Sequence, residues 1–484
     1  MKYIGLLLIL LIGSSIEAQT KLNKYYPVED SAVKQKLDDW RTLKFGLFMH
    51  WGTYSQWGIV ESWALCAEDE PWCRRENPNY EAFKRDYVAL KKTFNPTKFN
   101  PEKWAEAANK AGMKYMVFTT KHHDGFNMFD TQLSDYKITS KECPFHTNPK
   151  ADVTKAIFDE FRKKDFMIGA YLSKPDWHNE NFWWPNFTTP DRNVNYSIEK
   201  YPERWQAFVD FFHGQVDELM TNYGQVDILW MDGGWVRPLT KGQKKLINFI
   251  NGLFLKSGYT QLNIPQDQDL KISEMASKAR EKQPGLLVVD RHIEGPNENY
   301  LTPEQFIPDR YFEEPWESCI TLSGSWSYTP NGVYKSSREV IHMLCDVVSK
   351  NGSLLLNVGP SPEGTWPDEV YQRFEEIGEW MSVNGEAIYN TTGRKKFGHG
   401  KERYSVNSDG SVNAFYLVDK DEKLTETISF TALKIRKDQT IKLLGYDGNL
   451  KWNKKGGAIH INIPDEIRNS DKEYYALVFK LADK

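Results

Sequence analysis

The sequence predicts an α/β fold: a (β/α)8-like barrel of the TIM type, followed by a small C-terminal antiparallel β-sandwich. Short apolar runs alternate with amphipathic segments from about residue 45 to residue 385, as in a parallel sheet covered by helices. The strand candidates among these runs end in polar residues. From about residue 394, short alternating strands follow one another between Asp-Gly and Gly-Gly turns, without helices. A doubly wound open sheet shares the first pattern, but its Gly-rich first turn is missing here.

The barrel elements follow from the apolar periodicity. Asn100 suits a helix cap and Pro101 a first helical turn, and Gly112 ends the apolar stripe that begins there. Similar stripes predict helices near 157–161, 205–219, 269–283 and 369–385. The predicted strands are KFGLFMHWG (44–52), MKYMVFTT (113–120), FMIGAYLS (166–173), VDILWMDGG (226–234), LLVVDRH (286–292) and GSLLLNVGPSPEG (352–364).

The N-terminus predicts export. Lys2 precedes an apolar core at residues 4–12, and small residues lead to Ala18, as in a secretory signal peptide. We therefore divide the chain into a signal peptide (1–18), a catalytic barrel (19–390) and a β-sandwich (394–484), and expect a periplasmic or secreted protein. No other apolar stretch is long enough for a membrane span.

Composition limits the partners. The net charge is -4 and no long basic block occurs, so nucleic acid is not expected as a partner. The five cysteines lack the paired spacing of a structural zinc site. Cys66 and Cys73 are close enough in sequence to pair in an oxidising compartment. The aromatic stretch NFWWPNF (181–187) is interpreted as a binding wall, because a Pro- and Asn-rich loop has little core to fill.

The polar strand ends predict an active site. In a barrel the carboxyl ends of all strands meet at one face, where the catalytic residues are found. The residues concerned are His50, His122, His123, Tyr171, Ser173, Asp232, Asp290, Arg291 and His292.

Asp232 is the strongest catalytic candidate. It follows an apolar strand and precedes Gly233 and Gly234, which permit close approach of a ligand. Trp230 points to the same side of the strand, and a carboxylate beside an indole face suits attack on a sugar ring. Arg291 suits either hydroxyl binding or a structural ion pair with Asp290. The loop after Arg291 offers three possible proton donors: Glu294, Glu298 and Glu304.

The motifs together resemble a known family. FGLFMHWG, TTKHHDGF, AYLS, LWMDGGW, VVDR with ENYLTPE, PWESC, SWSY and LLLNVGPSPEG occur in the order seen in the α-L-fucosidases of glycoside hydrolase family 29. The resemblance extends from about Lys21 to the C-terminus. It implies an exo-acting retaining α-L-fucosidase that removes terminal fucose from glycans by double displacement, without a cofactor or metal.

The resemblance also implies residue roles. Asp232 matches the nucleophile, and Glu298 is predicted as the acid/base, with Glu294 as the alternative. Glu304 follows Pro303 and is expected to begin a helix instead. The fucose pocket is expected to contain His50, Trp63, His122, His123, Tyr171, Trp230, Arg291 and Trp326. Two departures from the family pattern occur here: ESW replaces a Glu directly before Trp at Glu61–Trp63, and Ser327 replaces Gly in SWSY.

Two other functions remain open from the residues. A metal-dependent hydrolase would use His50, His122, His123 and Asp232 on the same barrel, although no HxH pair occurs. A fucose-binding protein without catalysis would keep the pocket alone. His122 and His123 point to opposite sides if the strand continues through them, and both turn inward as donors to sugar hydroxyls if they lie in a loop.

Overall fold

The computed structural model describes residues 23–66, 73, 75, 77–189, 191–255, 266–436 and 439–483. The predicted signal peptide and most of the segment between Cys66 and Cys73 lie outside the described residues. Among the described residues, no helix combines the length and the apolar character needed to cross a bilayer.

The first part of the chain forms a curled parallel sheet, as predicted. Its strands are β1 (Phe45–Met49), β2 (Tyr115–Lys121), β3 (Met167–Ser173), β4 (Ile228–Asp232), β5 (Leu287–Asp290), β6 (Glu317–Thr321) and β7 (Ser353–Val358). They pair in the order β5-β4-β3-β2-β1-β7-β6. Strand β6 is the one that the six predicted runs omit, because ESCIT mixes polar and apolar residues without a clear period.

An irregular segment at residues 297–305 bridges the two edges of this sheet. On one side, Asp290 N donates to Asn297 O and Asn299 N donates to Val288 O, next to β5. On the other side, Glu317 N donates to Leu301 O and Gln305 N donates to Cys319 O, on β6. The segment therefore takes the place of an eighth strand and closes the barrel.

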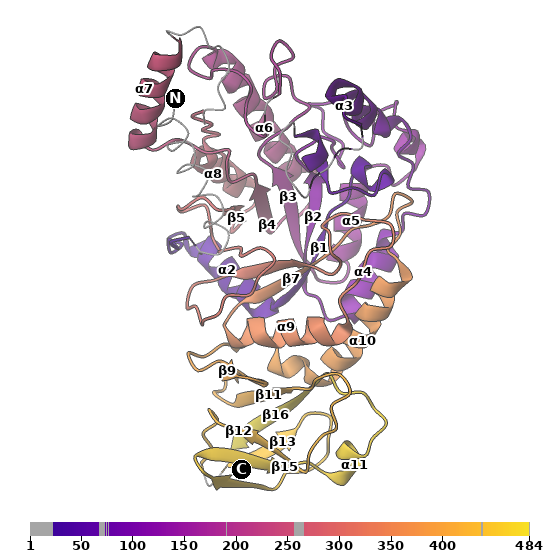
Figure 1. Ribbon diagram of the computed structural model, residues 1–484, viewed down its shortest axis with the longest axis vertical. Helices are drawn as coiled ribbons and strands as arrows, with labels where there is room; N and C mark the ends of the chain where they lie inside the picture. Colours follow the sequence, from indigo (N-terminus) through magenta and orange to yellow (C-terminus); the bar gives the residue numbers. More distant parts are fainter. Residues whose placement is uncertain are drawn as a thin grey trace.

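Most helices of this part lie around the outside of the sheet, and the one at residues 241–255 stands apart from it (Figure 1). The helices are α2 (Ser31–Leu43), α3 (Tyr80–Ala89), α4 (Pro101–Lys110), α5 (Val153–Arg162), α6 (Pro202–Asn222), α7 (Lys241–Leu255), α8 (Ile272–Lys282), α9 (Ser337–Ser349) and α10 (Asp368–Asn384). The Asn100 side chain accepts from Lys103 N at 3.1 Å, which confirms the predicted cap of α4. Helix α9 begins with a capping box of Ser336 and Glu339.

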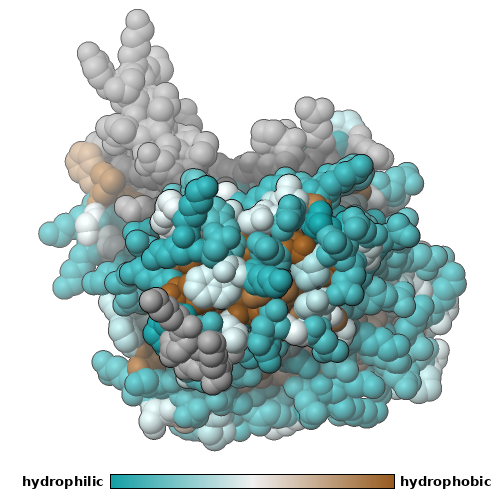
Figure 2. All heavy atoms as spheres, turned by 90° about the horizontal axis from the view of Figure 1, so that it is seen from below, coloured by the Kyte–Doolittle hydropathy of each residue, from teal (hydrophilic) through white to brown (hydrophobic). Residues whose placement is uncertain are grey.

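The C-terminal part is a two-sheet β-structure, as predicted. One sheet pairs β13 (Gln439–Leu443), β16 (Ala476–Asp483), β11 (Val412–Leu417), β10 (Glu402–Asn407) and β8 (Thr391–Thr392), with β9 (Gly398–His399) on β10. The other pairs β12 (Thr427–Phe430), β15 (Ala458–Asn462) and β14 (Trp452–Lys455), and the short helix α11 (Asp465–Arg468) follows β15. Aliphatic and aromatic residues fill the space between the sheets. At the end of the molecule seen from below, hydrophobic side chains gather at the centre and hydrophilic ones surround them (Figure 2).

Helices α9 and α10 lie between the parallel sheet and the sandwich (Figure 1). Trp380 Nε1 of α10 donates to Ala476 O at 3.0 Å, and a His342 ring nitrogen of α9 lies 2.8 Å from Tyr475 O. Arg403 of β10 forms an ion pair with Asp346 of α9. Polar contacts of this kind join the sandwich to the side of the barrel that carries α9 and α10.

Candidate active site

Asp232 is the last residue of β4 and the centre of a polar cluster. Its Oδ1 accepts hydrogen bonds from Arg291 Nη1 at 3.0 Å and from Gly233 N at 2.8 Å. Its Oδ2 accepts from the Tyr171 hydroxyl at 3.1 Å. The side chain keeps 18% of its surface exposed, so a ligand can still reach the carboxylate.

The surroundings of Asp232 keep its carboxylate charged. Burial, the largest single influence, would raise the pKa, but the charges of Arg291 and His123 and the hydrogen bond from the Gly233 amide together outweigh burial. The pKa of Asp232 therefore lies well below its ordinary value. The residue is an anion over the whole physiological pH range.

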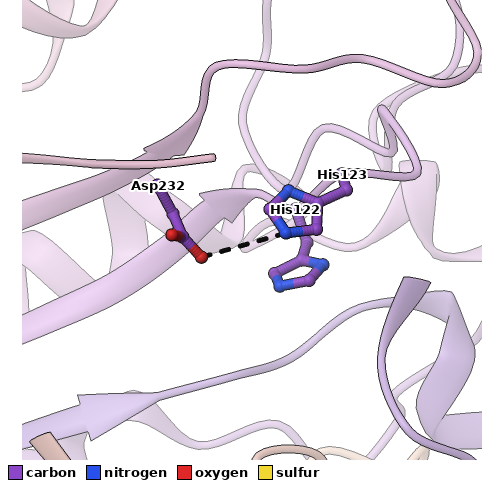
Figure 3. Close-up of side chains that lie close together, drawn as sticks. All are labelled: His122, His123 and Asp232. Carbon is purple, nitrogen blue, oxygen red and sulfur yellow. Dashed lines mark ion pairs between the residues drawn. The ribbon is translucent and has the colours of Figure 1, made fainter. Parts of the chain in front are cut away.

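His122 and His123 follow the end of β2 in a turn, so both rings face the cluster. Strand β2 ends at Lys121, and the two ring centroids lie 4.2 Å apart. His123 Nε2 lies 3.8 Å from Asp232 Oδ2 (Figure 3). Of the two arrangements that the sequence left open, the structure has the one in which both histidines follow the end of the strand.

The three pocket histidines are neutral. Burial lowers the pKa of His50 to about 4 and that of His123 to about 3, and it lowers the pKa of His122 well below the ordinary value. Neutral imidazoles offer one donor and one acceptor each, which suits an uncharged, hydroxyl-rich ligand.

His50 follows the end of β1 and contacts Asn357 of β7. Its Nδ1 lies 2.7 Å from Asn357 Oδ1, and Asn357 Nδ2 donates to Trp326 O at 2.7 Å. The Trp326 ring lies 5.0 Å from the His50 ring. The predicted residues His50 and Trp326 therefore lie side by side.

Aromatic rings line the pocket below and beside the histidines. Tyr171 stacks on Trp230 with ring centroids 5.5 Å apart, and it also stacks on His122 at 5.6 Å. Trp63 stands edge-on to His123 at 5.2 Å and remains partly exposed. The cluster therefore includes Trp63, the tryptophan of the ESW departure.

Arg291 links Asp232 to a second carboxylate, that of Glu304. Its Nη1 binds Asp232, and its Nη2 donates to Glu304 Oε2. Trp326 Nε1 donates to Glu304 Oε1 at 3.2 Å. The expectation that Glu304 begins a helix is wrong: the residue pairs with Cys319 of β6 in the segment that closes the barrel. This pairing aims its side chain at the cluster.

Glu298 lies in the same segment but turns elsewhere. Its Oε1 accepts from His292 N at 2.9 Å, and its Oε2 accepts from Asn23 Nδ2 at 3.2 Å. Burial raises its pKa to about 7, partly offset by these hydrogen bonds. Glu294 is exposed and accepts from Lys24 N at 3.3 Å. Among the described residues, the contacts of Glu298 and Glu294 do not include Asp232 or Arg291.

The ESW departure brings two further residues to the site. Glu61 is buried, and its Oε1 accepts from Ser327 N at 2.9 Å. Burial raises the pKa of Glu61 to about 8. Ser62 Oγ lies 2.6 Å from His122 Nδ1. Apart from the departure from the family pattern, nothing in the local sequence pointed to Ser62 or to Asn357.

Two of the four aromatic residues in the NFWWPNF stretch are buried, and Trp184 and Phe187 remain partly exposed. Phe182 and Trp183 are buried, and Trp183 stacks on Trp177 at 5.2 Å. Trp177 in turn lies 5.2 Å from His123. Trp177 and Trp183 therefore pack behind His123, and the interpretation of the partly exposed part of the stretch as a binding wall stays a prediction.

A metal ion fits this cluster poorly. Ligand atoms of His122, His123 and Asp232 lie within 4.8 Å of one another. However, both oxygens of Asp232 already accept hydrogen bonds, and the Arg291 guanidinium beside them repels a cation. His50, the fourth ligand of the metal hypothesis, is not a member of this group.

Comparisons with known proteins agree with the geometry. A family model described as alpha-L-fucosidase matches residues 12–386. The chain is 26% identical to an alpha-L-fucosidase of Dictyostelium discoideum, with full coverage of both chains. It is 26% identical to the human tissue alpha-L-fucosidase, over 92% of this chain and 90% of the relative.

Two solved structures are similar over nearly the whole chain. Alpha-L-fucosidase isoenzyme 1 of Paenibacillus thiaminolyticus is 26% identical with a TM-score of 0.71, covering 94% of this chain and 100% of that one. The Thermotoga maritima alpha-fucosidase in complex with a mechanism-based inhibitor is 25% identical with a TM-score of 0.70, covering 95% and 100%.

Proposed function

The chain belongs to the α-L-fucosidases of glycoside hydrolase family 29, and on that premise we propose that it is an exo-acting, retaining enzyme whose nucleophile is Asp232. It acts on a terminal α-L-fucose of a glycan or oligosaccharide. The observation that carries the proposal is the carboxylate of Asp232, partly exposed at a strand end and kept charged by Arg291.

The reaction proceeds in two displacements. Asp232 attacks the anomeric carbon, the bond to the leaving oxygen breaks, and a carboxylic acid protonates that oxygen. The same group, now a carboxylate, takes a proton from water as the water oxygen attacks the anomeric carbon. The bond between Asp232 and the anomeric carbon then breaks, and fucose leaves. Because the configuration at this carbon is inverted twice, it is retained overall.

Glu304 is our choice for this acid/base, in place of the sequence-based choice of Glu298. Position within reach of the reacting atoms is the first requirement, and the pKa is the second. Glu304 and Asp232 bind the two terminal nitrogens of one guanidinium, which supports a separation near the 5–5.5 Å of retaining enzymes. The raised pKa of Glu298 suits an acid, but its contacts lie away from the cluster.

Before substrate binds, Arg291 Nη2 donates to Glu304 Oε2. The leaving oxygen must therefore displace this contact for Glu304 to act as an acid, and Arg291 then turns to Asp232 and the sugar. This exchange is the same one that would let Arg291 recognise bound fucose.

The remaining pocket residues recognise an uncharged sugar. His50, His122 and His123 supply neutral donors and acceptors, and Tyr171, Trp230, Trp326 and Trp63 supply aromatic faces. We place catalysis in residues 19–390 and assign support of the barrel to residues 394–484. We assign residues 1–18 as the signal peptide that directs export of the enzyme.

Covalent trapping tests the proposal. A 2-fluoro fucosyl donor should leave a stable fucosyl label on the peptide that contains Asp232, identified by mass spectrometry. A label on another carboxylate would contradict the assignment. The metal-dependent alternative is based on the close approach of His122, His123 and Asp232. It predicts that EDTA abolishes activity and that zinc or manganese restores it. We expect no effect of EDTA on hydrolysis of an aryl α-L-fucoside.

A further inference from the structure

Ser62 is a fully buried serine next to a pocket histidine. It begins the short helix η2 (Ser62–Leu65), between Glu61 and Trp63. Its Oγ accepts a hydrogen bond from Asp124 N at 2.9 Å and lies 2.6 Å from His122 Nδ1. Among the described residues, these are the two hydrogen-bond partners of the hydroxyl.

The positions of the protons follow from these two contacts. Asp124 N is a donor, so it occupies a lone pair of Ser62 Oγ and leaves the hydroxyl proton to find an acceptor. A buried hydroxyl proton without an acceptor is costly, and His122 Nδ1 is the acceptor within reach. A neutral imidazole that accepts at Nδ1 carries its proton at Nε2.

We propose that Ser62 is a positioning residue that fixes His122 as a hydrogen-bond donor at Nε2. The inference rests on the proposed function only in assigning that donor to the sugar. It does not depend on which carboxylate is the nucleophile or the acid.

His50 is fixed with the opposite polarity. Asn357 Nδ2 donates to a backbone carbonyl, that of Trp326, so the oxygen of this amide faces His50 Nδ1. An amide oxygen only accepts, and His50 therefore carries its proton at Nδ1 and offers a lone pair at Nε2. The His50 and His122 rings lie 5.7 Å apart. The pocket thus presents one acceptor and one donor side by side.

With His50 as an acceptor and His122 as a donor, the pocket requires a ligand that both donates and accepts hydrogen bonds. A hydroxyl group donates to His50 and accepts from His122, and neighbouring hydroxyls of one sugar satisfy both. A group that only accepts, such as an ether or a fluorine, satisfies His122 and leaves His50 without a donor.

The loop that carries Ser62 is held by the other departure from the family pattern. The Ser327 hydroxyl donates to Ile59 O at 2.5 Å, and Ser327 N donates to Glu61 Oε1 at 2.9 Å. A glycine at position 327 would keep the second bond and lose the first. The two departures therefore meet in one loop, which places the Ser62 hydroxyl at His122.

The tautomers can be measured directly in the full-length enzyme. With 15N-labelled histidine, long-range 1H–15N spectra distinguish a protonated from an unprotonated ring nitrogen, and His50→Gln and His122→Gln assign the two signals. We expect His122 protonated at Nε2 and His50 protonated at Nδ1. Protonation of His122 at Nδ1 overturns the proposal, and this measurement requires no variant of Ser62.

Variants of Ser62 test its role in catalysis. Ser62→Ala should give His122 a mixture of tautomers and lower kcat/KM about tenfold, mainly through KM, because Asp124 N and His122 Nδ1 lose a buried partner. Ser62→Thr retains the hydroxyl and should restore both the tautomer and KM. Ser349→Ala removes another buried serine hydroxyl, in α9, and should change neither.

The outcomes separate this inference from the proposed function. An unchanged tautomer and KM in Ser62→Ala would refute the positioning role, whatever the activity of the parent enzyme. The expected tautomers in a protein that does not hydrolyse fucosides would support the role of Ser62 and refute the proposed function.

Discussion

The mouth of the barrel and the interior of the sandwich differ in whether their buried polar atoms have hydrogen-bond partners. The mouth buries His50, His122, His123 and Arg291, and it leaves His123 Nε2 and Arg291 Nε without a hydrogen-bond partner among the described residues. In the sandwich, the buried Glu402 accepts bonds from Thr431 N, the Thr431 hydroxyl and Tyr404. Among the residues that the structure describes, every buried side-chain nitrogen or oxygen atom without a hydrogen-bond partner precedes the sandwich in the sequence.

The difference shows which part of the chain is arranged for a ligand. An unpartnered buried polar atom destabilises a fold, and at the mouth, beside the partly exposed Asp232, a bound ligand can supply the missing partner. The sandwich core consists of Ile, Leu, Phe, Val and similar side chains, whose burial contributes stability instead. Substitutions in the two regions should therefore have opposite effects on activity and on stability.

The largest expected effect is that of Asp232→Ala. Turnover should fall at least about a thousandfold, since the proposed nucleophile is lost. The melting temperature should stay near that of the parent, because Arg291 retains Glu304 as a partner. Steady-state kinetics on an aryl fucoside and a thermal melt measure both. Turnover within tenfold of the parent would remove Asp232 from the mechanism.

The matching substitution in the sandwich is Phe479→Ala. Phe479 is fully buried and packs edge-on against Phe430 at 5.4 Å. Its removal should lower the free energy of unfolding by about 3–5 kcal/mol, while kcat at a temperature where the variant is folded stays unchanged. Denaturant titration and kinetics on the same sample separate the two. A parallel loss of kcat would mean that the sandwich takes part in catalysis.

Glu304→Ala and Glu298→Ala sharpen the comparison within the barrel. If Glu304 is the acid, its loss should lower kcat about a hundredfold on a fucosylated oligosaccharide and far less on an aryl fucoside, whose leaving group needs no proton. Azide should rescue the aryl reaction. Glu298→Ala serves as the control and should behave alike on both substrates. The reverse pattern would make Glu298 the acid, as the sequence suggested.

The last expected effect appears only as the pH changes and concerns Glu317, which is buried inside the barrel between Tyr115 and Trp230. Burial raises its pKa from 4.5 to about 8. A raised carboxyl pKa contributes stability that is full below pH 4.5 and is lost as the pH rises through 8. Relative to Glu317→Gln, the parent should lose on the order of 1 kcal/mol per pH unit in that window. Equal slopes for both proteins would contradict the raised pKa.

Apolar periodicity was enough to predict most of the fold. The strands that carry His50, His122, Tyr171, Asp232 and Arg291 were all expected, because a buried parallel strand is apolar throughout and its polar end is easy to recognise. Their meeting at one face follows from the barrel. The assignment of roles to these residues stays a prediction.

The position of Glu304 was beyond local patterns. Residues 297–305 have no strand periodicity, and Pro303 with Glu304 is typical of a helix start. The side chain faces Arg291 because Glu304 pairs with Cys319 on β6, fifteen residues later. Such a contact depends on how distant segments pair. For the same reason the contact of Ser62 with His122 was not foreseen, since sixty positions separate the two residues.

The closing segment has a consequence for how such a chain can diverge. Because backbone pairing with β6 holds Leu301 and Glu304, the number of residues between Arg291 and Asn297 has no influence on where Glu304 stands. Insertions and deletions in that stretch lengthen or shorten a surface loop without displacing the carboxylate. The interval in sequence between Asp232 and its partner is therefore free to drift from one descendant to another. A sequence alignment that assumes a constant spacing from Asp232 will therefore choose a glutamate other than Glu304.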